Sequence, residues 1–178
     1  NFGIYIERGK IGVTGNVIAG NYKALRYEQS DDSAVSVSSN IIFNNTGSPA
    51  VYLTGNAVRS EVYNDGNSVT VYSTGLEVKN NTIVGNVGDV SVGGSVADTS
   101  ASMLFNNNNI YDNVGTLTTR NQLGVDDFNA ENNYWGTSDA SAIATKVTDW
   151  NDDSSLNFVD YTPHQTAILT SNPIAPPS

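Results

Sequence analysis

The 178-residue chain contains no cysteine, which excludes disulfide bonds, thiol catalysis and zinc sites with cysteine ligands. Basic residues are also few: 8 Lys and Arg against 18 Asp and Glu give a formal net charge of −10 at pH 7. Nucleic acids and anionic membranes carry the same sign of charge, so we expect neither as a partner. No apolar run approaches the roughly 18 residues of a membrane-spanning helix, and we therefore expect no membrane insertion.

Asparagine and glycine are abundant instead, with 24 Asn and 16 Gly in the chain. Together with the frequent Ser, Thr and Val, these residues are mediocre or poor helix formers, so a mainly helical protein is not expected. Hydrophobic residues make up 38% of the chain and charged residues only 15%, a balance that favours a packed core over disorder. The length fits one domain.

A short sequence motif recurs along the chain: roughly Asn, any residue, then Ile or Val, with another Asn soon afterwards. The first Asn of the five copies stands at Asn16, Asn40, Asn81, Asn108 and Asn132. Three of the four steps between copies are close to 25 residues, and the step of 41 is either two short turns or one turn with an insertion. We favour the insertion, a hairpin within residues 57–73, because an Asn-Asp-Gly-Asn turn sequence lies in its middle.

Runs in which apolar and polar residues alternate lie between the copies, as in residues 50–54 and 76–79, and predict strands with one buried face. One unit cannot bury its apolar face alone, but stacked units share a core and pair equivalent strands about 4.8 Å apart. Asn accepts the left-handed backbone of a corner, and its amide can bond to the Asn above and below. The pattern predicts a parallel β-solenoid with an Asn ladder; an Asn-rich β-sandwich is the alternative.

The copies, together with Asn-Tyr-Trp-Gly at residues 133–136, resemble the right-handed parallel β-helix repeat family of the pectate-lyase-like superfamily. The resemblance implies an all-β, right-handed parallel β-helix of about five or six coils over residues 1–137. It also implies a C-terminal capping tail over residues 138–170, with Trp135 in the core beneath the cap and Gly136 in the terminal turn.

The ends of the chain read as a piece of a larger protein. It begins like the middle of a strand, and the Pro-rich residues 171–178 resemble a linker to a further domain of the same polypeptide. Proteins of the resembled family are secreted or lie on the cell surface, so we expect an extracellular or cell-surface location.

The sequence identifies no catalytic residues. Enzymes of the resembled superfamily (polysaccharide lyases, glycoside hydrolases and uronate epimerases) need carboxylates, or a carboxylate with a basic residue, on neighbouring coils. The acidic pairs here stand among turn residues, and His164 is the only histidine. No cofactor is required, but Asp149, Asn151 and Asp153 alternate and offer oxygen ligands to calcium. The alternative is that these three residues cap backbone amides in a turn.

Tyrosines in or beside the expected strands are the candidates for ligand binding. Tyr27, Tyr52 and Tyr111 would form a sugar-stacking surface if their rings point outward. The period-two alternation equally permits inward rings that pack in the core.

These observations predict a non-catalytic module of a larger secreted or surface protein. It would act as a rigid scaffold or adhesion element, or bind polysaccharide or a neighbouring surface protein along one face. One alternative is a polysaccharide-active enzyme whose catalytic coils lie here or N-terminal to residue 1. Another is a structural subunit of an extracellular assembly that pairs through its uncapped N-terminal coil.

Overall fold

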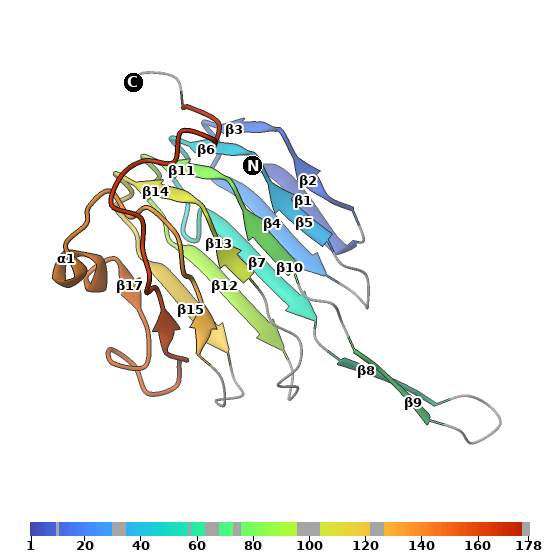
Figure 1. Ribbon diagram of the computed structural model, residues 1–178. Helices are drawn as coiled ribbons and strands as arrows, with labels where there is room; N and C mark the ends of the chain where they lie inside the picture. The colour runs from blue at the N-terminus through green and yellow to red at the C-terminus, as the bar shows by residue number, and fades with distance from the viewer. Residues whose placement is uncertain are drawn as a thin grey trace.

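The computed structural model is all-β apart from one short helix in the part of the chain that it describes (Figure 1). Parallel strands form three sheets, which we call A, B and C. The structure describes residues 1–9, 11–29, 35–56, 58–62, 68–72, 76–95, 104–121 and 127–175.

Within each of these sheets, neighbouring strands are not consecutive in the sequence. Sheet A contains, in spatial order, β1 (Phe2–Gly9), β4 (Lys23–Gln29), β7 (Val51–Asn56), β12 (Val90–Ser95), β15 (Leu117–Asn121) and β17 (Val147–Thr148). Sheet B contains β13 (Leu104–Asn106), β10 (Leu76–Lys79), β5 (Val35–Ser38) and β2 (Val13–Thr14). Sheet C contains β14 (Asn109–Tyr111), β11 (Thr82–Val84), β6 (Ile41–Phe43) and β3 (Val17–Ala19). Outside them lie the antiparallel hairpin β8 (Val58–Val62) and β9 (Ser68–Tyr72), and the parallel pair β16 (Phe128–Asn129) and β18 (Val159–Asp160).

Up to β14 the chain visits sheets A, B and C in turn and adds a strand to each sheet on every circuit, after which β15 and β17 extend sheet A alone among the described strands. In sheet C this places Ile18 opposite Ile42 and Ile42 opposite Ile83, although 41 residues separate the second pair. The long step of the repeat is therefore one circuit, which carries the β8–β9 hairpin between sheets A and B. This arrangement of parallel strands in stacked sheets is consistent with a parallel β-solenoid.

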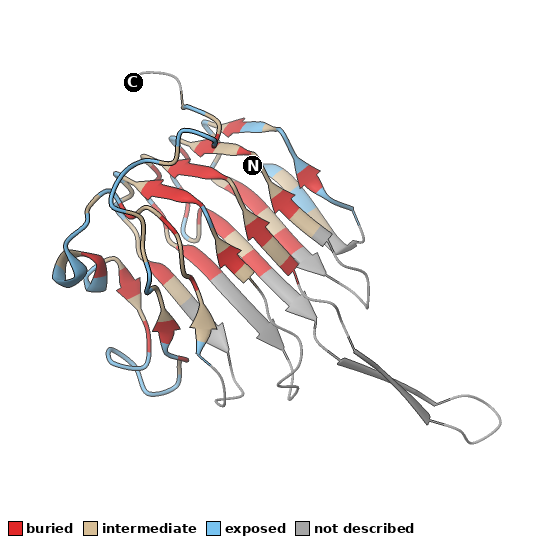
Figure 2. Cartoon of the chain, in the orientation of Figure 1, coloured by how far each residue is buried: buried red, intermediate tan, exposed pale blue. Residues whose placement is uncertain are grey.

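One hydrophobic core runs between the three sheets and is filled by the inward positions of their strands (Figure 2). Full burial of such a side chain stabilises the fold by about 1.5–3 kcal/mol. The columns are Leu25, Val51, Val90, Leu117 and Val147 from sheet A, Val13, Val37, Val78 and Phe105 from sheet B, and Ile18, Ile42, Ile83 and Ile110 from sheet C. Trp135 extends this cluster and is fully buried.

A ladder of asparagines forms the corner between sheets B and C. Its members are Asn16, Asn40, Asn81, Asn108 and Asn133. From Asn40 onward, the Oδ1 of each member accepts the backbone N–H and the Nδ2 of the preceding member, as Asn81 does from Asn40 at 3.0 Å and 3.0 Å. The residue before each member has a positive φ, which at Asn132 is 59°. The repeat alignment is therefore corrected by one residue at its end: Asn132 makes the left-handed corner, and Asn133 stands in the ladder.

A second ladder lies where the chain leaves sheet C. Its members are Asn21, Asn45, Asn86 and Asn113. Asn21 is joined to Asn45 Oδ1 by its backbone N–H, and Asn45 Nδ2 donates to Asn86 Oδ1 at 2.9 Å. Gly136 occupies the equivalent left-handed corner after Trp135, with a φ of 78°. The two ladders hold the circuits in register because the buried amides of Asn40, Asn81, Asn108, Asn45 and Asn86 each donate to the Asn of the next circuit.

Residues after the ladder cover the C-terminal end of the core. Helix α1 (Ala140–Ala144) begins after Asp139, whose side chain accepts the backbone N–H of Ser141 at 2.8 Å, and it buries Ile143. The β16–β18 pair and the segment after it complete the cover. Helix α1 is the only helix in the described ranges, and no helix there is long and apolar enough to cross a membrane.

Candidate functional site

An arginine lies between two tyrosine rings on the outer face of sheet A. Register places Tyr5 of β1, Arg26 of β4 and Tyr52 of β7 side by side. The Arg26 guanidinium carbon is 5.4 Å from the centre of the Tyr5 ring and 5.3 Å from that of Tyr52. Both distances permit a cation–π interaction, so one cation holds two rings on neighbouring strands in a fixed relation.

A second cation and ring lie beside this stack. Phe2 is opposite Lys23 in the β1–β4 register, and the Lys23 Nζ is 5.7 Å from the centre of the Phe2 ring. The Phe2 and Tyr5 rings are 5.2 Å apart, and their exposed fractions are 44% and 47%. We call Phe2, Tyr5, Lys23, Arg26 and Tyr52 the aromatic–cation platform.

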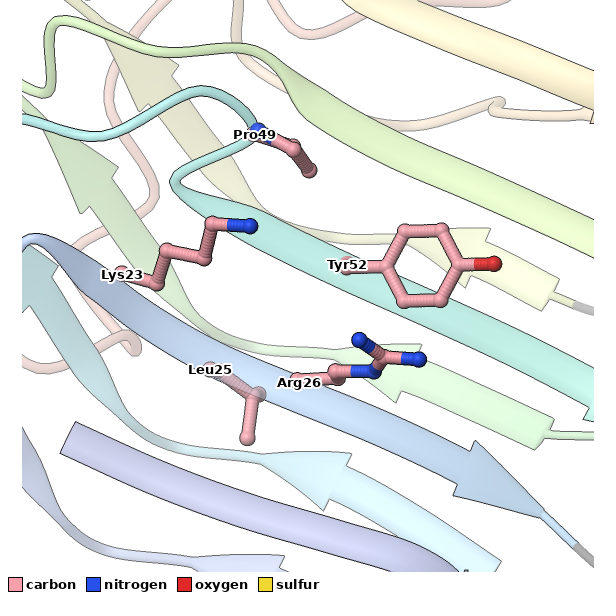
Figure 3. Close-up of a pocket in the computed structure, with 5 residues that line it drawn as sticks. All are labelled: Lys23, Leu25, Arg26, Pro49 and Tyr52. Atoms are coloured by element: carbon pink, nitrogen blue, oxygen red, sulfur yellow. The ribbon is translucent and has the colours of Figure 1, made fainter. Parts of the chain in front are cut away.

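A shallow pocket opens at the platform (Figure 3). Its volume is ≈ 190 Å³, and it is lined by Lys23, Leu25 and Arg26 of β4 and by Pro49 and Tyr52 of the next circuit. Figure 3 shows the Lys23 and Arg26 side chains on the same side of β4, with the Tyr52 ring above Arg26. The pocket therefore combines hydrogen-bond donors of positive charge with the face of an aromatic ring.

Beyond the platform, the same register positions of sheet A are held by Ser and Thr residues, of which Ser91 is only 2% exposed with a buried hydroxyl group. Tyr52 is opposite Ser91, Ser91 is opposite Thr118, and Thr118 is opposite Thr148. The Oγ1 atoms of Thr116 and Thr148 lie 2.8 Å apart. At about 4.8 Å for each strand, the row from Tyr5 to Thr148 is roughly 24 Å long.

The three tyrosines predicted from the sequence do not come together. Tyr52 belongs to the platform, whereas Tyr111 lies in sheet C with its ring 6.3 Å from that of Tyr134. Burial, Asp112 and Tyr134 raise the pKa of Tyr111. The prediction is wrong for Tyr27, whose side chain is fully buried in the core because it follows the outward Arg26 by one position, and burial raises its pKa.

The sequence alone did not predict Phe2, Tyr5, Lys23 and Arg26 as members of one site. The available signal was the alternation itself: Arg26 and Tyr52 hold the same outward position in two runs that pair as β4 and β7. Alternation leaves open which set of residues faces outward, and the burial of Tyr27 decides it.

The suggested calcium ligands are engaged with the backbone around them. Asp149 is buried, its Oδ1 accepts the N–H of Asn151 at 2.9 Å, and its Oδ2 accepts the N–H of Val159 at 3.2 Å. Asp153 is exposed and accepts the N–H and hydroxyl of Ser155, which lowers the pKa of Asp153. These contacts fit the capping interpretation, and calcium binding stays a prediction.

No group of three His, Asp or Glu side chains that could hold a metal ion is found among the described residues. The imidazole Nε2 of His164 lies 3.2 Å from the carbonyl oxygen of Ser138, in the segment that covers the C-terminal end. Neither observation assigns a catalytic role to a residue.

Comparison with known proteins gives no match: no family model, no curated protein and no solved structure is significantly similar to the chain. The all-β architecture, parallel sheets and buried Asn ladders are compatible with a β-helix, and the narrower resemblance to pectate-lyase-like proteins stays a prediction.

Proposed function

We propose that the chain is a non-catalytic, right-handed β-helix module of five or six coils that binds a polysaccharide along the outer face of sheet A. The single observation that supports this function is the Tyr5–Arg26–Tyr52 stack. It places flat aromatic faces and a fixed hydrogen-bond donor at one point of a regular, elongated surface.

The chemistry of the platform suits a sugar. Aromatic rings bury the apolar faces of pyranose rings, while the forked guanidinium of Arg26 and the ammonium of Lys23 donate to hydroxyl or carboxylate oxygens. The parallel strands of sheet A continue beyond the platform to Thr118 and Thr148, and a long regular face of this kind suits a linear polymer. A scaffold or adhesion role at the cell surface, within a larger protein, follows from the same proposal.

Glycan-array binding with a matched pair of variants tests the proposal. Tyr52→Ala removes one wall of the stack, and we expect about fivefold weaker binding, since a cation–π or stacking contact contributes about 1 kcal/mol. Tyr111→Ala removes a half-buried tyrosine from sheet C, away from the platform, and is expected to bind as the parent does. Equal binding by all three proteins, or no binding to any glycan, would remove the support for this function.

The enzymatic alternative is tested on the same glycans. Incubation of the protein with each bound glycan should yield no ultraviolet-absorbing unsaturated uronate and no new reducing ends. The appearance of either product would replace the binding module by a lyase or a hydrolase.

A second candidate function, assembly through the N-terminal edge, is favoured by a separate observation. This edge consists of β1, β2 and β3, each of which is the last strand of its sheet. Within the described residues, no donor reaches the Oδ1 atoms of Asn16 and Asn21, the first members of the two ladders. Ile11 and Val17 are 66% and 64% exposed there. Ladder acceptors and apolar side chains together suit another β-coil.

Sedimentation over a concentration series tests assembly. The parent chain should associate, and Val17→Lys should abolish association by placing a charge on the edge. Val114→Lys is the matched control, because Val114 is 78% exposed at a corner on a later circuit. A parent chain that stays monomeric at every concentration would contradict self-assembly.

A further inference from the structure

Two polar side chains on the outside of sheet C are fully enclosed. Thr82 of β11 and Asn109 of β14 occupy adjacent outward positions in register, yet their exposed fractions are 0% and 1%. The equivalent outward residue of β3, Val17, is 64% exposed. Something therefore covers the sheet at Thr82 and Asn109 that does not cover it at Val17.

The cover is the C-terminal segment Leu169–Pro173, which we call the tail strap. In Figure 1 this part of the chain, drawn in red, runs along sheet C toward the C-terminus. Asn109 binds the main chain of Leu169 with both ends of its amide: Nδ2 donates to the Leu169 carbonyl at 3.0 Å, and Oδ1 accepts the Leu169 N–H at 2.8 Å. Thr82 Oγ1 donates to the carbonyl of Pro173.

The strap inserts one side chain of its own. Asn172 is 4% exposed, and its Nδ2 donates to the carbonyl of Asn107 at 2.8 Å and to that of Asn81 at 3.4 Å. Those carbonyls belong to the corners of two successive circuits, so Asn172 bridges them. A turn in the strap, closed by the Asn172 N–H on the Leu169 carbonyl at 3.2 Å, points the amide inward.

The strap contacts the surface of the sheet as a bound ligand would, since none of its residues belongs to the hydrophobic core cluster. Thr170 and Ser171 are exposed, and the preceding residues 166–168 are exposed as well. Its described hydrogen bonds to the sheet come from two side chains, Asn109 and Thr82, and from two corner carbonyls. Without the strap, the side chains of Thr82 and Asn109 would lose these hydrogen bonds, although the face that carries them is already formed by β11 and β14.

We propose that the outer face of sheet C is a peptide-binding site that recognises a Leu-x-x-Asn-Pro turn, with the chain's own tail strap as its resident ligand. Asn109 and Thr82 form hydrogen bonds with the main chain of the turn, and the corner carbonyls of Asn81 and Asn107 accept hydrogen bonds from its Asn side chain. The surface beyond the strap, where Ile41 is half-buried and Val17 exposed, remains open to residues that extend from the turn. This site is independent of the aromatic–cation platform.

Cleavage of the folded full chain tests the proposal. A protease site inserted between Thr166 and Ala167, both exposed, converts the strap into a separate peptide without changing the rest of the molecule. After cleavage and gel filtration, the strap should either stay bound or, if lost, rebind as a labelled peptide of residues 167–175 with saturation in fluorescence anisotropy. The same peptide with Asn172→Ala should be retained or rebound about tenfold more weakly, because two hydrogen bonds are lost.

The control peptide carries Thr170→Ala, which changes an exposed side chain and should bind as the parent peptide does. Asn109→Ala in the full chain, cleaved in the same way, should weaken every peptide. Loss of the strap with no rebinding would overturn the proposal. Equal binding of the parent and Asn172→Ala peptides would overturn it as well, since the site would not then read the Asn side chain.

Discussion

The two ends of the stacked sheets differ in the hydrogen bonding of their last polar groups. At the C-terminal end, Asn133 is fully buried and its carbonyl accepts the N–H of Gln165 at 2.9 Å, while the enclosed Trp135 has an indole N–H with no hydrogen-bond partner among the described residues. At the N-terminal edge, Asn16 is half-buried, and its Oδ1 accepts no hydrogen bond within the described residues. Val17 beside it is exposed, whereas its equivalents on later circuits are progressively covered.

This difference separates two kinds of residues: those that recur on every circuit, and those that occur only at an end of the repeat. Every circuit has the same corner and the same inward apolar residues, so each presents the next one with ladder acceptors and unpaired strand edges. The C-terminal end meets that requirement with non-repeating residues: α1, the β16–β18 pair and the segment after them. At the N-terminal edge, Ile11 and Val17 are exposed and β1, β2 and β3 are the last strands of their sheets, which is why we propose this edge as a candidate for assembly.

The largest effect on stability is expected when the buried tryptophan at the covered end is replaced. Trp135→Ala should lower the free energy of unfolding by about 3–5 kcal/mol, because it removes a fully enclosed side chain and leaves a cavity. Val17→Ala, at the uncovered edge, should change it by less than about 0.5 kcal/mol. Urea unfolding followed by circular dichroism measures both. Similar losses for the two variants would show that the edge is as enclosed as the capped end.

The next effect compares the middle of a ladder with its end. Asn81→Ala removes the side-chain donor to the Val37 carbonyl and to Asn108 Oδ1, and it leaves the backbone N–H of the buried Asn40 without its acceptor. We expect a loss of about 3 kcal/mol, since each abandoned buried group costs about 1–3 kcal/mol. Asn16→Ala keeps its backbone bond to Asn40 and should cost about 1 kcal/mol.

Denaturant midpoints and slopes of the two asparagine variants give the comparison directly. A smaller loss for Asn81→Ala than for Asn16→Ala would mean that the ladder does not act through mutual satisfaction of buried amides. An unchanged slope in both variants is required for the free energies to be compared.

Much of the fold could be predicted because the same local problem is solved on every circuit. A corner needs a left-handed residue followed by an amide that bonds to its neighbours, and that requirement makes Asn recur. The last copy shows the limit: Asn132 and Asn133 both satisfy the composition of the corner, and only the backbone shows which one has the positive φ. The second ladder was missed although its Asn residues were visible in the same motif.

The site was harder to predict because it depends on residues that repeat nothing. Tyr27 and Tyr52 stand in paired strands with similar surroundings in sequence, yet Tyr27 is in the core and Tyr52 is on the outer face. The tail strap has no periodic signal at all, and its enclosure of Asn109 depends on a contact across 60 residues. Pro-rich composition suggested a linker from residue 171, but Asn172 is buried against sheet C.

The smallest expected effect is on how stability changes with pH in alkaline solution, compared for one tyrosine near each end. Burial raises the pKa of Tyr27 above its ordinary value of 10.0, because the core disfavours the phenolate. Below pH 10 both the folded and unfolded states keep this proton, and stability does not depend on it. Above pH 10 the unfolded state releases the proton first, so stability falls as pH rises toward the folded-state pKa, by up to about 1.4 kcal/mol for each pH unit.

Tyr27→Phe should therefore unfold less steeply with pH between about pH 10 and 12 than the parent does, each compared with its own stability at pH 8. Tyr111→Phe, near the covered end, should flatten the profile less, because Tyr111 is only half-buried, although Asp112 and Tyr134 add to the effect of burial on its pKa. Thermal melts at closely spaced pH values measure the three slopes. An equal flattening of the pH profile by both variants would show that both tyrosines contribute equally to the loss of stability at alkaline pH. It would contradict a larger contribution from Tyr27, which lies on β4, one strand away from β1.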